Sequence, residues 1–230
     1  MNNIDAVFES YLARLNFCPL CNHAINAVSN LYTFKGLVLI PVLWWLWCRA
    51  DERREWTRQI VIATILSGIL ALFIGRVLAD FLPFRARPIN TPELHQHFAS
   101  ILHQESVLPT WSSFPSDHAM LWMSVAVGIF IISRRVGVLA LLYTAIFICV
   151  PRAYLGIHYP TDLLAGALIG IVITYGMTRD SIRNLYAPTV LRWMERYPGL
   201  SAMLAFVLCL ELVTQFDELR QFASSVYKIL

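Results

Sequence analysis

The sequence predicts an all-α integral membrane protein, in which residues 1–230 form a single membrane-embedded domain with six transmembrane helices. Of the 230 residues, 57% are hydrophobic and only 14% are charged, whereas a soluble domain has about 25% charged residues. The apolar residues also gather in six runs, most of them close to the roughly 20 residues that cross a bilayer. These observations argue against a soluble enzyme, a disordered chain and a nucleic-acid-binding protein.

We expect the six apolar runs to form transmembrane helices, of which the fourth can extend to Tyr154. The expected spans are residues 31–48, 59–82, 117–133, 136–150, 161–177 and 200–216. The segment before the first span is polar and carries Asp5 and Arg14, so it does not resemble a cleavable signal. Its apolar residues share one helical face, which predicts an interfacial N-terminal helix with Val7, Tyr11, Leu15 and Phe17 on that face.

The connection between the second and third spans, residues 83–115, is long, and long connections often carry function or structure of their own. Thr91 and Pro92 are typical of a helix start, because proline is favoured at the first helical position. Apolar residues then repeat at helical spacing, at Leu94, Phe98, Ile101 and Leu102. We therefore expect an outer-loop helix that lies on the membrane surface.

The positive residues are almost all arginines, and ten of them lie on one side of the expected bundle. These ten follow the first, third and fifth spans: Arg49, Arg53, Arg54, Arg58, Arg134, Arg135, Arg179, Arg183, Arg192 and Arg196. Short cytoplasmic loops are enriched in Lys and Arg, so this side is expected to face the cytoplasm. Both termini and the loops after the second and fourth spans then face outward. The expected location is a bacterial inner (plasma) membrane.

Three polar clusters interrupt the apolar chain, at residues 84–88, 114–118 and 151–162. Because the spans alternate in direction, all three clusters fall on the same outer membrane face. Clusters placed without a common purpose would be expected to fall on both faces. Their convergence therefore predicts one functional site at the outer surface.

The residue types in the three clusters suit the binding of a phosphate group. Arg87 and Arg152 offer planar forks of hydrogen-bond donors that match phosphate oxygens. Ser116 is a favourable N-cap, which places Asp117 and His118 in the first turn of a helix. The free backbone N–H groups and the positive dipole at such a helix start favour an anion.

The same clusters contain groups suited to phosphoryl transfer. Asp162 follows His158 by four residues, so its carboxylate can bond one ring nitrogen of His158 and orient the other. An oriented, neutral imidazole is a competent nucleophile, and His118 can protonate the leaving oxygen. Arginines can supply the charge stabilisation that phosphoryl transfer needs. We expect no metal and no cofactor, because no complete set of metal ligands is visible in the sequence.

On these residues the sequence resembles the type-2 phosphatidic acid phosphatase superfamily, over roughly residues 76–166. The signature of that superfamily is Lys-x6-Arg-Pro, then Pro-Ser-Gly-His, then Ser-Arg-x5-His-x3-Asp. Here the three parts read Arg87-Pro88, Pro115-Ser116-Asp117-His118, and Pro151-Arg152 followed by His158 and Asp162. The resemblance implies that His158 attacks phosphorus, Asp162 orients it, and His118 protonates the leaving group. It also implies that Arg87, Ser116 and Arg152 bind the phosphate.

The sequence departs from that signature at three positions. Asp80 stands where the signature has lysine, and an acid cannot take the role of a lysine beside phosphate. Arg85 is then the candidate for the missing positive charge, while Arg76 is placed to form a helix ion pair with Asp80. Asp117 replaces glycine, so its carboxylate must turn away from a phosphate or pair with an arginine. In addition, Pro151 replaces serine, with the loss of a hydroxyl and an N–H.

The Pro-Ser-Asp-His variant is similar to that of bacterial undecaprenyl-pyrophosphate phosphatases. The resemblance therefore implies hydrolysis of a polyprenyl pyrophosphate to the monophosphate, with a lipid phosphate and the bilayer as partners. The alternatives within the superfamily are a phosphatidylglycerophosphate, phosphatidic acid or lipid A phosphatase and a lipid phosphotransferase. A lipid-binding or transport protein is the alternative outside enzymes, but transporter sites tend to lie at mid-membrane rather than at span ends.

Overall fold

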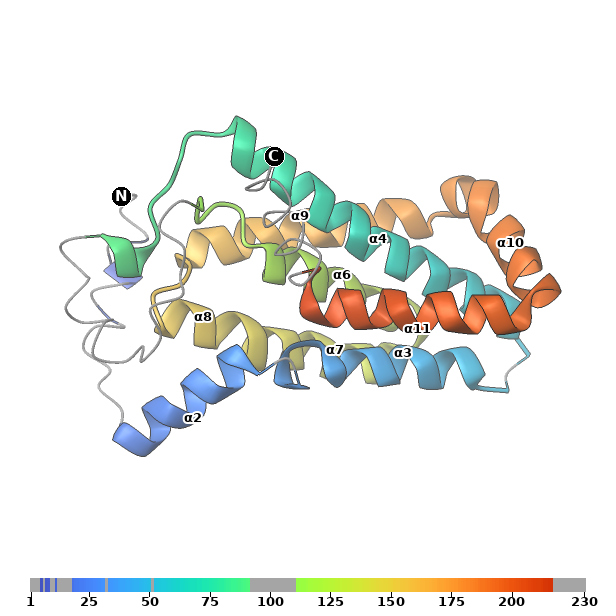
Figure 1. Ribbon diagram of the computed structural model, residues 1–230, viewed down its shortest axis with the longest axis horizontal. Helices are drawn as coiled ribbons and strands as arrows, with labels where there is room; N and C mark the ends of the chain where they lie inside the picture. Colours follow the sequence, from blue (N-terminus) through green and yellow to red (C-terminus); the bar gives the residue numbers. More distant parts are fainter. Residues whose placement is uncertain are drawn as a thin grey trace, which may run out of the picture.

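The computed structural model describes residues 5, 7, 8, 11, 18–31, 33–50, 52–91 and 111–216. Within these ranges every regular element is helical, which confirms the all-α prediction, and the helices form an elongated bundle (Figure 1). The longer helices are α2 (Pro19–Asn30), α3 (Leu39–Cys48), α4 (Arg54–Phe81), α6 (Asp117–Ile132), α7 (Arg134–Tyr143), α9 (Pro160–Thr178), α10 (Asp180–Arg196) and α11 (Pro198–Thr214). The shorter ones are the π-helices η1 (Thr33–Leu37) and η3 (Thr144–Cys149), the 3-10 helix η2 (Pro88–Asn90) and α8 (Val150–Tyr154).

Three helical stretches of the described chain are long and apolar enough to cross a membrane. They are Arg54–Phe81, Arg134–Tyr154 and Pro160–Thr178, and the second runs through α7, η3 and α8. The other three expected spans correspond to shorter apolar helices, namely α3, α6 and α11. The helical character of all six regions is confirmed, whereas the count of six membrane crossings stays a prediction.

Three other regions differ from the sequence-based expectation or lie wholly or partly outside the described residues. Residues 180–196, expected as part of a loop, form the helix α10, in which charged and apolar residues alternate around the helix. At the N-terminus, Asp5, Val7, Phe8 and Tyr11 are helical, but Leu15 and Phe17 lie outside the described residues. The helix expected on the outer loop also lies outside them, beyond Thr91.

The core of the bundle forms where α6 packs against α4 and α9, around the fully buried Trp122. Two glycines on α9 allow this close approach. A Cβ at Gly166 would lie 2.6 Å from the carbonyl oxygen of Ser116, and one at Gly170 would lie 2.3 Å from that of Met120. Small residues four apart are a common device for bringing membrane helices together. Here they hold the start of α9 directly beside the start of α6.

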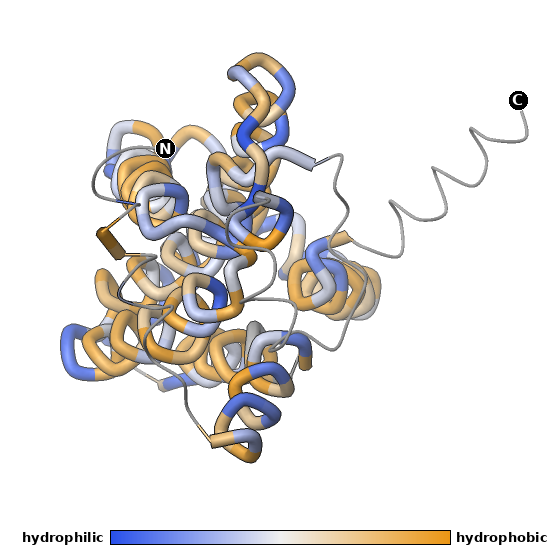
Figure 2. The backbone as a smooth tube through the Cα atoms, turned by 90° about the vertical axis from the view of Figure 1, so that its left-hand side faces the viewer, coloured by the Kyte–Doolittle hydropathy of each residue, from blue (hydrophilic) through white to orange (hydrophobic). Residues whose placement is uncertain are grey.

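Large apolar side chains also cover the outside of the bundle. Phe73, Leu168 and Phe206 are 66%, 62% and 71% exposed, and Figure 2 shows hydrophobic residues around the whole circumference of several helices. A soluble protein rarely exposes contiguous apolar surface on this scale. A lipid environment would solvate these side chains, so the exterior agrees with the membrane-spanning helices.

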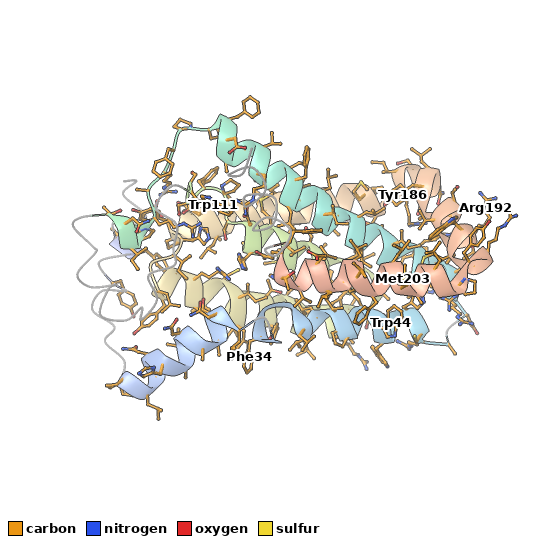
Figure 3. All side chains as sticks on the ribbon, in the orientation of Figure 1. Phe34, Trp44, Trp111, Tyr186, Arg192 and Met203 are labelled. Atoms are coloured by element: carbon orange, nitrogen blue, oxygen red, sulfur yellow. The ribbon has the colours of Figure 1, made fainter. Side chains whose placement is uncertain are left out.

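The two ends of the bundle have different contents. The C-terminal end of α4, the N-terminal ends of α6 and α9, and α8 all lie at one end, and α10 lies at the other (Figure 1). Figure 3 places Trp111 near the first end and Arg192 at the second. The structure thus brings the three predicted polar clusters to a single end, opposite the arginine-rich α10.

Candidate active site

A polar cavity of about 120 Å³ lies at the end of the bundle where the three clusters meet. It is lined by Arg76, Ala79, Arg87, Trp111, Ser112, Pro115, Asp117, His118, Arg152, His158 and Gln215. These residues come from the end of α4, the loop after it, the start of α6, α8, the turn before α9 and the end of α11. The cavity therefore unites both predicted histidines with two of the predicted arginines.

His158 lies buried in the turn between α8 and α9, and it lines the cavity. Its Nδ1 is 2.9 Å from the carbonyl oxygen of Ser113. A carbonyl only accepts hydrogen bonds, so Nδ1 must carry the proton, and the lone pair then belongs to Nε2. Burial holds the pKa of His158 well below its usual range, and the positive charges of Arg87 and Arg152 add to this effect. The ring is thus a neutral imidazole with one available nitrogen.

Asp162 supports His158 through an intermediary rather than by the predicted direct bond. Its carboxylate accepts hydrogen bonds from the Ser113 hydroxyl and, at 3.0 Å, from the backbone N–H of Tyr159. The Ser113 carbonyl then receives the Nδ1 proton of His158. The prediction of a direct Asp162–His158 contact is therefore wrong in this structure. The reason is that Asp162, in the first turn of α9, reaches backward to cap that helix and to hold the loop containing Ser113.

Arg85 does not line the cavity, and the prediction that it supplies charge to the phosphate is also wrong. Its guanidinium pairs with the carboxylates of Asp162 and Asp5 and donates to the Thr161 hydroxyl at 3.0 Å. The ring of Tyr159 lies 4.2 Å from its guanidinium carbon, in a cation–π contact. The buried carboxylates of Asp5 and Asp162 bind this guanidinium, so it does not enter the cavity. Asp5 could not be identified as a partner from residue order, because it lies 80 residues from Arg85.

Arg87 and Arg152, predicted as phosphate ligands, are both brought to the cavity, and their contact with phosphate stays a prediction. Both line the cavity, and both act electrostatically on His158. Arg87 donates to the carbonyl of Ile157 at 3.3 Å, while its Nε is buried with no partner among the described residues. Burial lowers the pKa of Arg87, although the charge of Asp117 opposes that effect. A buried cationic donor left unsatisfied is costly unless an anion completes its bonding.

The start of α6 has the geometry predicted from the sequence, with a different use of its side chains. Ser116 occupies the N-cap position, yet its hydroxyl makes no capping bond and is buried with no partner in the described part of the chain. Ser116 is not among the residues that line the cavity, whereas Asp117 and His118 in the first turn are. Because Ser116 does not line the cavity, the structure gives no support for its expected contact with phosphate.

Arg76 supplies the cavity with a third positive charge that sequence reasoning assigned elsewhere. The expected Arg76–Asp80 pair is wrong, because Asp80 is exposed and the guanidinium of Arg76 instead forms an ion pair with Asp117. The Trp111 ring lies 4.3 Å from that guanidinium. A Cβ at Gly75 would come within 3.2 Å of the Asp117 carboxylate. The signature has glycine at position 117, where this chain has an aspartate. Here Gly75 on the facing helix α4 leaves room for the Asp117 carboxylate.

Several further cavity or support residues were missed from the sequence, among them Trp111, Ser113 and Gln215. Trp111 and Ser113 belong to the long loop, where spacing gives no indication of which residues turn inward. Gln215 enters the cavity because the chain turns sharply at the end of α11, with a left-handed backbone conformation at φ 56°. That turn carries no glycine or asparagine to reveal it.

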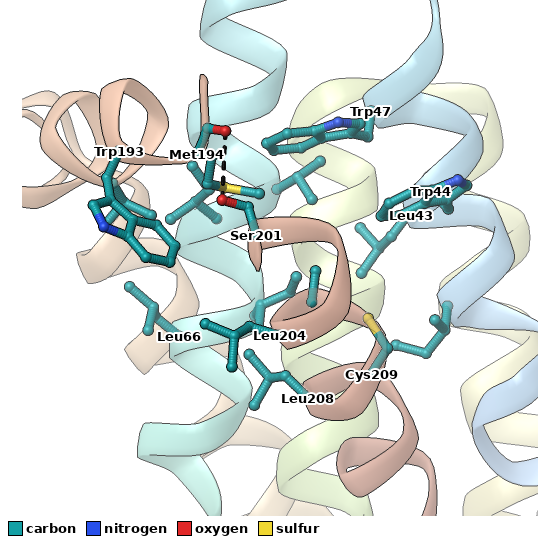
Figure 4. A pocket seen from close by; sticks show the side chains of 16 residues that line it. Leu43, Trp44, Trp47, Leu66, Trp193, Met194, Ser201, Leu204, Leu208 and Cys209 are labelled. Carbon is teal, nitrogen blue, oxygen red and sulfur yellow. Dashed lines mark hydrogen bonds between the residues drawn. The ribbon is translucent and has the colours of Figure 1, made fainter. Parts of the chain in front are cut away.

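A larger cavity of about 200 Å³ lies toward the opposite end of the bundle, between α3, α4, α10 and α11 (Figure 4). Its walls are apolar apart from Ser201, whose hydroxyl donates to the Met194 carbonyl at 3.4 Å. Among the described residues its lining includes Cys209 but no arginine, lysine or histidine. Neither cavity holds a group of three or more metal-ligating side chains among the residues described. The phosphate chemistry expected from the sequence is therefore concentrated in the polar cavity.

A cavity of histidines and arginines at one end of a helical membrane bundle defines a membrane-surface anion site. A family model described as the PAP2 superfamily matches residues 56–186, more than half of the chain. The chain therefore belongs to the PAP2 superfamily, as the three-part signature indicated.

Curated relatives and a solved structure agree with this assignment. The chain is 32% identical over 141 residues to the bacitracin transport permease protein BcrC of Bacillus licheniformis, covering 61% of this chain and 63% of that protein. It is 29% identical over 119 residues to an undecaprenyl-diphosphatase of Sulfolobus acidocaldarius, covering 52% and 54%. The chain thus spans less than two thirds of the length of either relative. The crystal structure of a PAP2-type phosphatidylglycerolphosphate phosphatase from Bacillus subtilis shares its fold, with TM-score 0.51, 18% identity, and 77% and 85% coverage.

Proposed function

We propose that the protein hydrolyses a polyprenyl diphosphate, undecaprenyl diphosphate in particular, to the monophosphate at an outward-facing site. The observation that carries this proposal is the tautomer of His158, which has its nucleophilic nitrogen available in a cavity lined by arginines. The relative named undecaprenyl-diphosphatase supports the choice of substrate. The apolar exterior supports a substrate that arrives from the bilayer.

The reaction proceeds in two steps on the residues of the cavity. In the first, Nε2 of His158 attacks the terminal phosphorus, the bond to the bridging oxygen breaks, and His118 gives that oxygen a proton. The lipid monophosphate leaves, and a phosphohistidine remains. In the second, water attacks this phosphorus, gives its proton to His118, and the N–P bond breaks to release inorganic phosphate. Arg87 and Arg152 neutralise the oxygens of the transferred group throughout.

The proposed orientation rests on the distribution of arginine between the two ends. The ten arginines expected to face the cytoplasm belong to the segments around α10 and to the turns at the end opposite the cavity. By the positive-inside rule, the polar cavity then faces the periplasmic side. A reporter fused after Leu230 would test this: activity only in the periplasm supports the orientation, and activity only in the cytoplasm overturns it.

The test of the proposed function compares purified protein on undecaprenyl diphosphate, phosphatidic acid and phosphatidylglycerophosphate. We expect the highest kcat/KM on the diphosphate, and an acid-labile phosphoenzyme when the terminal phosphate is labelled. The His158→Ala variant should lose the phosphoenzyme, whereas His23→Ala, which changes an exposed histidine on α2 outside the cavity, should retain it. Equal rates for the wild type and His158→Ala would remove the nucleophile assignment. Unchanged rates in EDTA are also expected, since the proposed steps use no metal.

A further inference from the structure

The three arginines that line the polar cavity differ in their relation to His158. Arg87 and Arg152 are the cations whose charge lowers the pKa of His158, whereas the charge of Arg76 acts on Arg87. Arg76 comes from the end of α4 and contacts Trp111 and Asp117. A phosphoryl group within reach of His158 would be bound by Arg87 and Arg152, which leaves Arg76, on α4 in the same cavity, for a second phosphoryl group.

Asp117 lies where it can act as an exchangeable counter-ion for Arg76. Its carboxylate pairs with that guanidinium and rests against the backbone of α4 at Gly75. The side chains of Arg76 and Asp117 are 38% and 17% exposed, so solvent and ligands reach the pair. A partly exposed ion pair contributes little to stability. An incoming anion can therefore take over the arginine at small cost.

We infer that the Arg76–Asp117 pair makes the site selective for diphosphates over monophosphates, an inference that rests on the proposed function. Arg76 binds the second phosphoryl group, which carries the lipid and leaves as the monophosphate. Asp117 holds Arg76 in place when that group is absent and repels an anion that is too small to displace it. A monophosphate ester has one phosphorus, already bound by Arg87 and Arg152, and gains nothing from Arg76.

Binding of inorganic anions tests the inference without depending on catalysis. Isothermal titration of the purified full chain with pyrophosphate and with phosphate would be compared for the wild type, Arg76→Gln and Asp117→Asn. Hydrogen bonds to charged groups contribute enough to predict about a 10-fold weaker pyrophosphate affinity for Arg76→Gln, with less than about a 3-fold change for phosphate. Asp117→Asn removes the competing carboxylate, so pyrophosphate binding should tighten. Arg192→Gln, on the far end of the bundle, serves as the matched control.

The two variants are expected to move in opposite directions, which separates this inference from a simple loss of folding. Equal weakening of pyrophosphate and phosphate by Arg76→Gln would overturn it, as would a wild type that binds both anions alike. The failure of the proposed function has a different result. If the wild type does not hydrolyse undecaprenyl diphosphate but Arg76→Gln still selectively weakens pyrophosphate, the substrate assignment fails and the selectivity pair stands.

Discussion

Arg85 and Arg87 are two residues apart, yet they belong to regions of opposite character on the two sides of His158. Behind the histidine, Arg85 is held between Asp5 and Asp162, and each charged group there has a partner. In front, Arg76, Arg87 and Arg152 share the cavity with one carboxylate among the residues that the structure describes, that of Asp117. The loop that contains Arg85 and Arg87 therefore contributes one arginine to each of two regions with different roles. The compensated region holds His158 in place, and the excess positive charge of the other region suits it to the proposed binding of an anion.

The largest effect should come from removing a cation in front of the histidine. Arg152→Gln takes away a charge that acts on His158 and, in the proposed mechanism, on the transferred phosphate. Loss of one group that stabilises transition-state charge costs about 10²–10³-fold in kcat, so a loss of that order is expected. Steady-state rates on the lipid diphosphate would measure it. Arg152→Lys should recover only part of the activity, because lysine lacks the planar fork.

A smaller effect is expected behind the histidine, at Ser113. Ser113→Ala removes the hydroxyl that links Asp162 to the loop but keeps the carbonyl that receives the Nδ1 proton. We expect about a 10-fold fall in kcat with KM nearly unchanged, because the phosphate-binding arginines are untouched. Ser201→Ala, which removes a hydroxyl from the cavity at the opposite end of the bundle, is the control. A rise in KM as large as the fall in kcat would contradict the positioning role.

The effect should be smaller still at Asp5, the outermost member of the rear network. Asp5→Asn leaves Arg85 paired with Asp162 and keeps an oxygen for Thr161. A few-fold loss of kcat is expected, together with a lower melting temperature, since one buried ion pair loses its charge. Parallel activity and thermal-unfolding measurements would show both. If Asp5→Asn abolished activity while folding normally, the two regions would not be separate in function.

The pH dependence of kcat/KM distinguishes the two regions through the position of its acid limb rather than through the size of the rate. The pKa of His158 is lowered in the folded protein, so the neutral, nucleophilic form persists as the pH falls through 6.5 and is lost only at lower pH. Arg152→Gln removes one cause of that lowering, so the acid limb of kcat/KM should move toward 6.5. Asp5→Asn should leave the limb in place. If Arg152→Gln and Asp5→Asn had their acid limbs of kcat/KM at the same pH, the charge of Arg152 would have no separate effect on His158.

Much of this arrangement could be predicted from residue order, because the signals were local. Pro160 and Ser116 mark helix starts where helices do begin, and the alternation of apolar runs correctly placed the three clusters at one end. The roles of individual charges were harder to predict. Whether Arg85 or Arg76 faces the cavity depends on carboxylates that are distant in sequence, Asp5 in one case and Asp117 in the other. Charge pairing at long range has no periodic pattern.

Helix α10 shows a second limit of sequence reasoning. Its arginines suggested a cytoplasmic loop, and they do lie at the end opposite the cavity, but the segment is continuously helical. Positive charge sets the side of the membrane without specifying backbone conformation. Apolar residues such as Ala187 and Leu191 pack against α4 and provide the face that makes the helix stable.

The contact between Asp5 and Arg85 bears on how the protein is best handled in the laboratory. The region matched by the family model begins at residue 56, so a shortened chain chosen from that match would omit Asp5. Arg85 would then pair with one carboxylate instead of two, and Asp162 alone would balance its charge. We expect such a shortened chain to underestimate the activity of the whole, and affinity tags are better fused to the C-terminal end than next to Asp5.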